Sequence, residues 1–224
     1  PKIEKFKENW CCNTSKLVHI VLSPKNEHFT YLENNIILGK SNENNDKYDV
    51  LIFARRDIDK IIIPSFVKHI SASAFSECKK LKEIQFLQNS ELLTIGPNAF
   101  AFVAIQKFYI SAHVEELRDN WCNHLSQLRS IEISPENKNF KYLDKNRQII
   151  VGKSDKKSDV FDVLVIASRD TVEAFIPSQI KYISSSAFAY CNFFNRIEFS
   201  SDSKLVSIGK SAFFRSSIVE IKIP

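Results

Sequence analysis

The stretch ISASAFSECKKLKEIQF, residues 70–86, decides the fold, because a second version of it, ISSSAFAYCNFFNRIEF, stands at residues 183–199. The two versions are 113 positions apart and keep the order Ile, Ala-Phe, Cys and a final Ile-x-Phe. That final run alternates with a period of two, as a strand with one buried face does. One strand and one turn cannot bury their own apolar side chains, so the repetition indicates copies that stack on one another.

The repetition extends over the whole chain. Residues 1–111 and 112–224 are two versions of one super-repeat, since WCCNTSKLVHIVLSPKNEHFTYL (10–32) matches WCNHLSQLRSIEISPENKNFKYL (121–143). Within each version the Ala-Phe motif recurs after 25 residues, at Phe75 and Phe100 and again at Phe188 and Phe213. We therefore expect one solenoid domain over residues 1–224. The sequence ends at the repeat phase at which it begins, so we expect it to be part of a longer array.

The coils are expected to place their strands side by side in a parallel sheet on one, concave, face. Each Ala-Phe segment is too short for a free helix and is expected to form one helical or 3₁₀ turn on the convex side. Two segments, NNIILGKSNENNDKYDVLIFA and RQIIVGKSDKKSDVFDVLVIA, are predicted to form inserted β-hairpins. Gly96 and Gly209 follow Ile in matching units and indicate turns. The expected strands are residues 18–22, 60–64, 82–86, 106–110, 129–133, 173–177, 195–199 and 219–223.

Composition excludes several classes of protein. The 224 residues are 44% hydrophobic and 25% charged, with a net charge of +5 spread over interleaved acids and bases. This favours an ordinary folded chain and gives no Lys/Arg block that would follow the phosphates of a nucleic acid. No apolar run approaches the roughly 18 residues of a membrane span, so direct membrane insertion is not expected.

Motifs for catalysis and for metal binding are missing from the sequence. The chain has no GxSxG, HExxH or glycine-rich phosphate loop, and its five histidines do not recur between the two versions. We expect no enzyme activity, no cofactor and no metal site. The polar loops SNENNDKYD and SDKKSDVFD hold clustered Asp and Asn, but their spacing matches no calcium loop, and solvated turns are expected instead.

The cysteines predict buried thiols and no disulfide framework. Their number, five, is odd, and no CxxC motif occurs. Cys78 and Cys191 are interpreted as matching residues, as are Cys12 and Cys122, which leaves Cys11 as the candidate for a reactive thiol.

The stretch IPSFVKHISASAFSECKKLKEIQF, residues 63–86, resembles the BspA-like leucine-rich repeat, also called type 5. The resemblance implies a leucine-rich-repeat solenoid, a right-handed β/α superhelix, and a place at the cell surface or outside the cell. It also implies adhesion or protein–protein binding. The stretch 106–125 departs from the pattern because it lacks Ile-Pro-Ser and Ala-Phe and has Trp121 in place of Phe, and Ser216 stands where Cys is usual.

The candidate binding residues are the apolar exceptions on the expected concave face, whose outward positions are otherwise mostly polar. They are Val21, Ile62, Tyr109 and Phe175. Exposed apolar residues on a rigid surface are typical of binding hot spots. The alternative is that the hairpins cover them.

The expected partner is a protein or glycan on another cell or in the matrix. A structural spacer or self-assembling repeat array is the alternative. If a eukaryote secretes the protein, Asn13 of Asn13-Thr14-Ser15 is a candidate glycosylation site.

Overall fold

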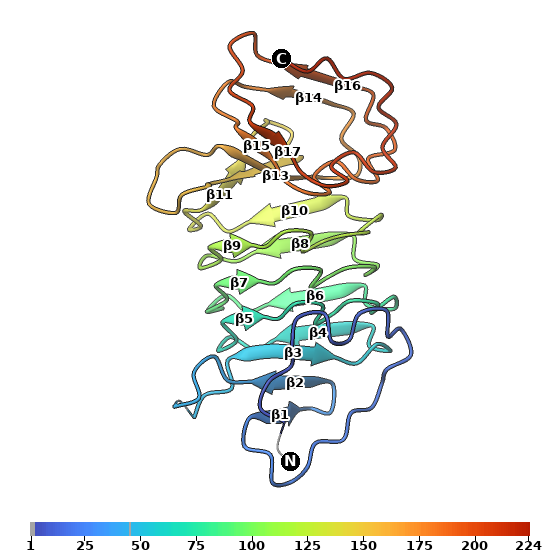
Figure 1. The fold of residues 1–224 in the computed structure, drawn as a ribbon, viewed down its shortest axis with the longest axis vertical. Helices are drawn as coiled ribbons and strands as arrows, with labels where there is room; N and C mark the ends of the chain where they lie inside the picture. Colours follow the sequence, from blue (N-terminus) through green and yellow to red (C-terminus); the bar gives the residue numbers. More distant parts are fainter. Residues whose placement is uncertain (1–2, 45) are drawn as a thin grey trace. The chain divides into compact units, whose positions relative to one another are not determined.

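The computed structural model describes residues 3–44 and 46–224 (Figure 1). The chain divides into two compact units. Unit 1 runs as far as Ile105 and includes Glu116–Leu125, whereas unit 2 contains Gln106–Glu115 and Ser126–Pro224. In each unit the chain forms successive coils, and these coils contribute strands to separate sheets. The solenoid of stacked leucine-rich-repeat coils expected from the sequence is therefore present in both units.

Unit 1 contains a six-stranded sheet in the order β1-β2-β3-β5-β7-β9 and a two-stranded sheet, β4-β6. The first three strands form an antiparallel meander, of which the inserted segment supplies β2 and β3, and the two-residue strands of successive coils continue the sheet in parallel. The strands are β1 (Phe29–Leu32), β2 (Ile36–Gly39), β3 (Val50–Ala54), β4 (Lys60–Ile63), β5 (His69–Ile70), β6 (Glu83–Phe86), β7 (Thr94–Ile95) and β9 (Glu116–Leu117).

Unit 2 follows the same plan. Its larger sheet has five strands in the order β11-β12-β13-β15-β17, and two parallel pairs, β8-β10 and β14-β16, form separate sheets. The strands are β8 (Lys107–Ile110), β10 (Ser130–Ile133), β11 (Phe140–Tyr142), β12 (Ile149–Gly152), β13 (Val163–Ala167), β14 (Glu173–Ile176), β15 (Tyr182–Ile183), β16 (Arg196–Phe199) and β17 (Ser207–Ile208).

The Ala-Phe segments form hydrogen-bonded turns, and residues 3–44 and 46–224 contain no helix. The reason is that alternate amides in these segments have different partners. Ser76 N donates to Ser73 O within its own coil at 3.1 Å, whereas Phe75 N donates to Ala99 O of the next coil at 2.8 Å. A 3₁₀ helix would need every amide for its own turn. The bonds between coils therefore replace the helical turn that the sequence suggested.

Positive φ values recur in pairs four residues apart along these turns, as at Ser73 and Glu77, whose φ values are 58° and 68°. Ser73 is the third residue of the turn closed by the bond from Ala74 N to Ser71 O. A type II turn requires positive φ at that position. The same pairing holds at Asn98 and Phe102, Asn120 and His124, Ser186 and Tyr190, and Ser211 and Arg215.

The two matching glycines each begin a turn and lie close to the neighbouring coil. A Cβ on Gly96 would lie 2.6 Å from Ala72 N, and one on Gly209 would lie 2.4 Å from Ser185 N. Neither glycine has a positive φ. The turns expected at these glycines are present, since Ala99 N donates to Gly96 O and Ala212 N donates to Gly209 O, each at 3.2 Å. The spacing between coils is what excludes a side chain here.

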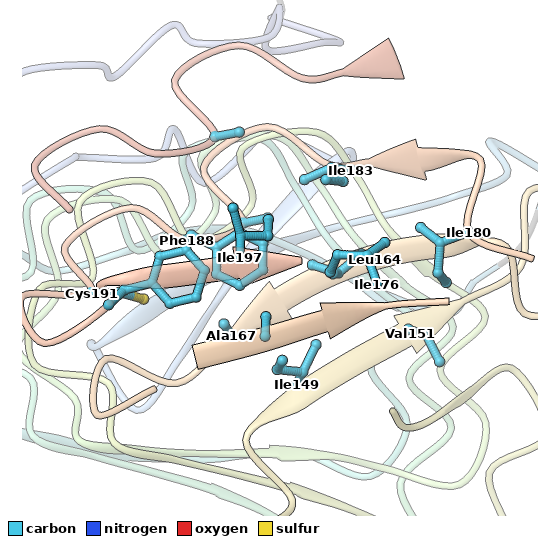
Figure 2. Close-up of a cluster of buried hydrophobic side chains, with 14 residues drawn as sticks. Ile149, Val151, Leu164, Ala167, Ile176, Ile180, Ile183, Phe188, Cys191 and Ile197 are labelled. Atoms are coloured by element: carbon cyan, nitrogen blue, oxygen red, sulfur yellow. The ribbon is translucent and has the colours of Figure 1, made fainter. Parts of the chain in front are cut away.

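The core of each unit is built around stacked Phe rings. In unit 1, Phe75 and Phe100 are fully buried, and their ring centroids are 5.0 Å apart. In unit 2 the rings of Phe188 and Phe213 stack at 5.3 Å, and Phe213 is only partly buried. Figure 2 shows Phe188 beside Cys191 within the buried cluster that also contains Leu164 and Ile197. In each unit, strands and turns thus pack around buried apolar side chains.

Most of the expected strands form with boundaries within one residue of those expected. Residues 18–22 and 219–223 are the exceptions, since neither forms a strand. The inserted hairpins are present as β2-β3 and β12-β13, and each gains a further strand, β1 or β11, that the sequence did not indicate. The short strands β5, β7, β9, β15 and β17 were also missed, because two residues are too few to show an alternating pattern.

Candidate functional site

A groove of about 500 Å³ lies in unit 1 between β4 and the tip of the β1-β2 hairpin. The tip is a tight reversal in which Glu33 and Asn34 have φ values of 50° and 55°, as in the type I′ turns of hairpins. It supplies one wall, and β4 with β6 supplies the other. The lining residues are Leu32, Glu33, Asn35, Ile36, Lys60, Ile61, Ile62, Pro64, Glu83 and Gln85.

Ile62 is the exposed apolar residue of this groove. Its side chain is 56% exposed, and it lies opposite Gln85 in the β4-β6 register. Next to it along the same open surface, Lys60 lies opposite Glu83. An apolar side chain surrounded by polar ones is the usual pattern of a small binding surface.

One end of the groove adjoins a basic patch. Lys60 and Glu83 also line a second hollow whose other residues are Asp59, Lys79, Lys80 and Lys82. Lys79 forms an ion pair with Glu77, with 2.9 Å between Nζ and Oε2. The lysines outnumber the acids in this hollow, so its potential favours an acidic group.

Unit 2 has a groove of about 670 Å³ between β10 and the loop that joins β11 to β12. Tyr109, Tyr142 and Arg147 line it, and the ring of Tyr142 lies 5.5 Å from the guanidinium carbon of Arg147. Here the hairpin loop carries the two extra residues, and the carboxylate of Asp144 accepts hydrogen bonds from Gln148 N and Ile149 N to close it. The longer loop therefore shapes a different groove.

The four candidate binding residues fall into two groups. Val21, Ile62 and Phe175 are exposed, at 94%, 56% and 58%. Tyr109 is half-buried and lies in the groove of unit 2, opposite Glu132. Ile62 and Phe175 hold equivalent places on β4 and β14, and the hairpins leave both exposed. Val21 belongs to no strand, so its expected place on a sheet face was wrong.

Asn13, the candidate glycosylation site, is exposed and has a φ of 58°. The neighbouring Thr14 hydroxyl donates to Cys11 O at 2.7 Å. The side chain of Asn13 is thus at the surface of the turn that holds the first cysteines.

Two buried aspartates, which sequence reasoning missed, fix the bases of the polar loops. Asp49 accepts bonds from Ser41 N at 2.9 Å and Ser41 Oγ at 2.8 Å, and Asp162 does the same with Ser154 at the same distances. Burial alone raises the pKa of Asp162, but the bonds from Ser154 and the charge of Lys181 bring it below its ordinary value. The aspartates recur before Val in matching segments, which was the available signal.

A buried arginine, also missed, lies beneath the cysteines of unit 1. Arg56 is 3% exposed, and its Nη1 donates to Ala74 O at 2.8 Å. Its guanidinium also lies 4.5 Å from the centre of the Phe53 ring. The matching Arg169 in unit 2 is 4% exposed and donates to Ala167 O at 3.0 Å. Their recurrence in ARRD and ASRD was the signal for a shared structural role.

The cysteines are free thiols, and four of them are buried. Cys11 is one of these, and burial raises its pKa, an effect that the nearby Arg56 opposes. Burial likewise raises the pKa of Cys78 to about 11. The expectation that Cys11 is the reactive thiol was wrong, since the half-exposed residue is Cys12. The offset of 111 residues that relates Trp10 to Trp121 makes Cys11, not Cys12, the equivalent of Cys122.

Within the described ranges, 3–44 and 46–224, no three His, Cys, Asp or Glu side chains are placed to hold a metal ion. The pKa of His69 is lowered by burial, and its Nδ1 lies 2.9 Å from Thr94 Oγ1. A search of the same residues for a helix long and apolar enough to cross a membrane found none.

A family model matches most of the chain. The family described as "BspA type Leucine rich repeat region" matches residues 50–146 and 167–224 in six copies. Together these ranges cover more than half of the chain. A comparison with curated proteins found no match.

Three solved structures share the fold. A pneumococcal vaccine antigen, PcpA, has a TM-score of 0.61 at 23% identity over 69% of this chain. A leucine-rich cell surface protein of Faecalibacterium prausnitzii A2-165 has a TM-score of 0.60 at 22% identity over 70%. A leucine-rich repeat protein of Eubacterium ventriosum has a TM-score of 0.55 at 20% identity over 70%. The similar regions cover 36%, 39% and 45% of those three chains.

Proposed function

Because the chain belongs to the BspA-type leucine-rich repeat family, we propose that it is a non-catalytic binding module of a cell-surface protein. It engages a protein or glycan on another cell or in the matrix through the open face of its two-stranded sheets. The description of the Faecalibacterium prausnitzii protein as a cell surface protein supports this location. We also propose the right-handed superhelix that the family resemblance implies.

The observation that carries this proposal is the exposure of an apolar residue at the same strand position in both units. Ile62 and Phe175 occupy equivalent strand positions, and each is more than half exposed. Their neighbours across the sheet, Gln85 and Glu198, are polar and exposed. Such a residue gains most when a partner removes it from water, and a rigid sheet loses little conformational entropy on binding.

The test is a binding screen with cells, matrix proteins and a glycan array, followed by the double variant Ile62→Ser/Phe175→Ser. We expect the variant to bind at least roughly tenfold more weakly, since hot-spot residues contribute about 2 kcal/mol or more. Val206→Ser is the matched control, because Val206 is 68% exposed but lies beside β17 in the other sheet of unit 2. Circular dichroism checks that both variants fold. Equal binding by the variant and the control moves the site away from these strands.

Self-association is the structural alternative. It requires concentration-dependent assembly of the purified protein, which sedimentation velocity measures. If the chain assembles but binds nothing in the screen, the binding proposal is rejected in favour of a structural spacer or a self-assembling array.

A further inference from the structure

The β4 strand of unit 1 has one unpaired edge. Among the strands of residues 3–44 and 46–224, β4 pairs with β6 alone. Asp59 O accepts a bond from Lys82 N at 2.8 Å, so Asp59 directs its backbone groups toward β6. Because these groups alternate along a strand, Ile61 and Ile63 also face β6, whereas Lys60 and Ile62 direct their N–H and C=O groups the other way.

The outer edge of β10 in unit 2, a strand that pairs with β8, shows how a side chain closes such an edge. There the hydroxyl of Tyr142 accepts a bond from Ile133 N at 3.2 Å and donates to Ile131 O at 3.0 Å. One side chain thus satisfies outward groups of two residues and blocks pairing at that edge. Within the described part of unit 1, nothing bonds to the outward groups of Lys60 and Ile62.

The groove described above lies along the open edge. Its far wall is the hairpin tip, Leu32 to Ile36, and its floor and near wall include Ile61 and Ile62. Ile61 is only partly buried, so an apolar side chain placed beside it would complete its burial. An added strand lies about 4.8 Å from its neighbour and offers alternate side chains to two faces. A volume of about 500 Å³ in this place suits a short extended segment.

The charges of the neighbouring hollow determine which end of a bound segment should be acidic. The basic patch of Lys79, Lys80 and Lys82 adjoins Lys60, at the first residue of β4. An acidic side chain is favoured there, whereas Ile61 and Ile62 further along the strand favour an apolar one.

We propose that the β4 edge binds an extended segment of a partner protein by strand addition. The segment places acidic residues beside Lys60 and β-branched apolar residues beside Ile61 and Ile62. Its main chain exchanges hydrogen bonds with the outward groups of Lys60 and Ile62, which supply affinity, and its alternate side chains supply specificity. This inference rests on the proposed function and names the partner chemistry of one of its two surfaces.

The probe is a fluorescein-labelled hexapeptide with two acidic residues followed by alternating Val and Thr, together with its reversed sequence. Fluorescence polarisation with the whole chain is expected to show saturable binding of one of the two at millimolar peptide or below. Methylation of alternate amides then separates strand addition from side-chain binding. Methyl groups on the amides that face β4 should weaken binding at least roughly tenfold, and methyl groups on the other amides should not.

Variants of the protein give an independent readout. Ile62→Pro removes an outward N–H while the bonds to β6 stay in place, and Ile62→Ser keeps that N–H but removes the apolar side chain. Both should weaken binding, and only Ile62→Pro should abolish the difference between the two methylated peptides. Lys60→Glu should weaken binding of the acidic peptide. It should not change the binding of a peptide that has Thr in place of the acidic residues.

Absence of saturable peptide binding, or equal binding by both methylated forms, overturns strand addition. The proposed function fails separately, if the chain also ignores cells, matrix proteins and glycans. A third outcome is that binding in the screen depends on Ile62, and that Ile62→Pro weakens it no more than Ile62→Ser does. This result retains the proposed function and rejects strand addition.

Discussion

Arg56 donates a hydrogen bond to the thiol of Cys11, with 3.1 Å between Nη2 and Sγ. The same guanidinium reaches Cys78 Sγ at 3.6 Å through Nη1. No carboxylate accepts from this arginine among the bonds that the described residues form, and backbone carbonyls of the turns take most of its donors. A buried cation is costly, so its presence implies that these bonds outweigh the loss of hydration.

The first prediction concerns that balance. Arg56→Met keeps a long side chain but removes the donors to Ala54 O and Ala74 O. We expect the free energy of unfolding to fall by about 2 kcal/mol, because several buried carbonyls lose a bond. Urea denaturation measures the change. A variant as stable as the parent would mean that relief from burying the charge offsets the lost bonds.

The second prediction compares two rings of the Phe stacks. Phe100→Ala should lower the free energy of unfolding by roughly 3–5 kcal/mol, because the ring is fully buried. Phe213→Ala should lower it by less than half as much, since Phe213 is only partly buried. Denaturant midpoints of the two variants decide this. Equal losses would contradict the burial described for these rings.

The third prediction concerns thiol chemistry at alkaline pH. Burial raises the pKa of Cys78 from 9.0 to about 11, so the unfolded chain loses this proton first as pH rises. Stability from this group is complete below pH 9 and is lost as pH rises from about 9 to about 11. Cys78→Ala should flatten the fall in unfolding free energy over that range.

Alkylation of the native protein gives a companion result. Cys12 should be modified first, because it is half-exposed and the other four thiols are buried. Mass analysis of peptides after a short exposure to iodoacetamide identifies the site. Faster labelling of Cys11 would contradict its burial.

The fourth prediction concerns acid. The pKa of Asp162 is depressed in the folded state, chiefly because the bonds from Ser154 and the charge of Lys181 outweigh burial. Its contribution is therefore present above its unfolded pKa and is lost as pH falls through the lower folded value. Asp162→Asn should lose stability at neutral pH and show a weaker decline on acidification. Hydrogen exchange should also quicken in residues 153–161. If the free energy of unfolding declines equally in both proteins on acidification, the bonds between Ser154 and Asp162 do not stabilise the fold in this way.

The sequence predicted the strands that carry the candidate site, because Lys60–Ile63 and Glu173–Ile176 occupy matching places in the two versions of the repeat. It did not predict the turns, since a short Ala-Phe segment has the same pattern whether its amides bond within one coil or to the next. Val21 shows a second limit. Its segment has the pattern of a strand, yet pairing depends on a neighbour that the local sequence does not specify.

The exposure of Ile62 followed from its place in an alternating strand, and the free edge beside it did not. A groove separates that edge from the hairpin tip at Glu33, whereas the hydroxyl of Tyr142 fills the outer edge of β10. Tyr31 and Tyr142 are matching residues, and only the structure distinguishes their roles. The buried arginines were hidden for a related reason, because charged residues in a loop usually face solvent.

Residue-resolved amide exchange by NMR tests the open β4 edge most directly. We predict that Ile61 and Ile63, which face β6, exchange slowly in the free protein, and that Ile62 exchanges fast. Addition of the acidic Val/Thr hexapeptide should slow Ile62 and leave Ile61 and Ile63 unchanged. Slow exchange of Ile62 in the free protein, or no change on addition of saturating peptide, would contradict the account.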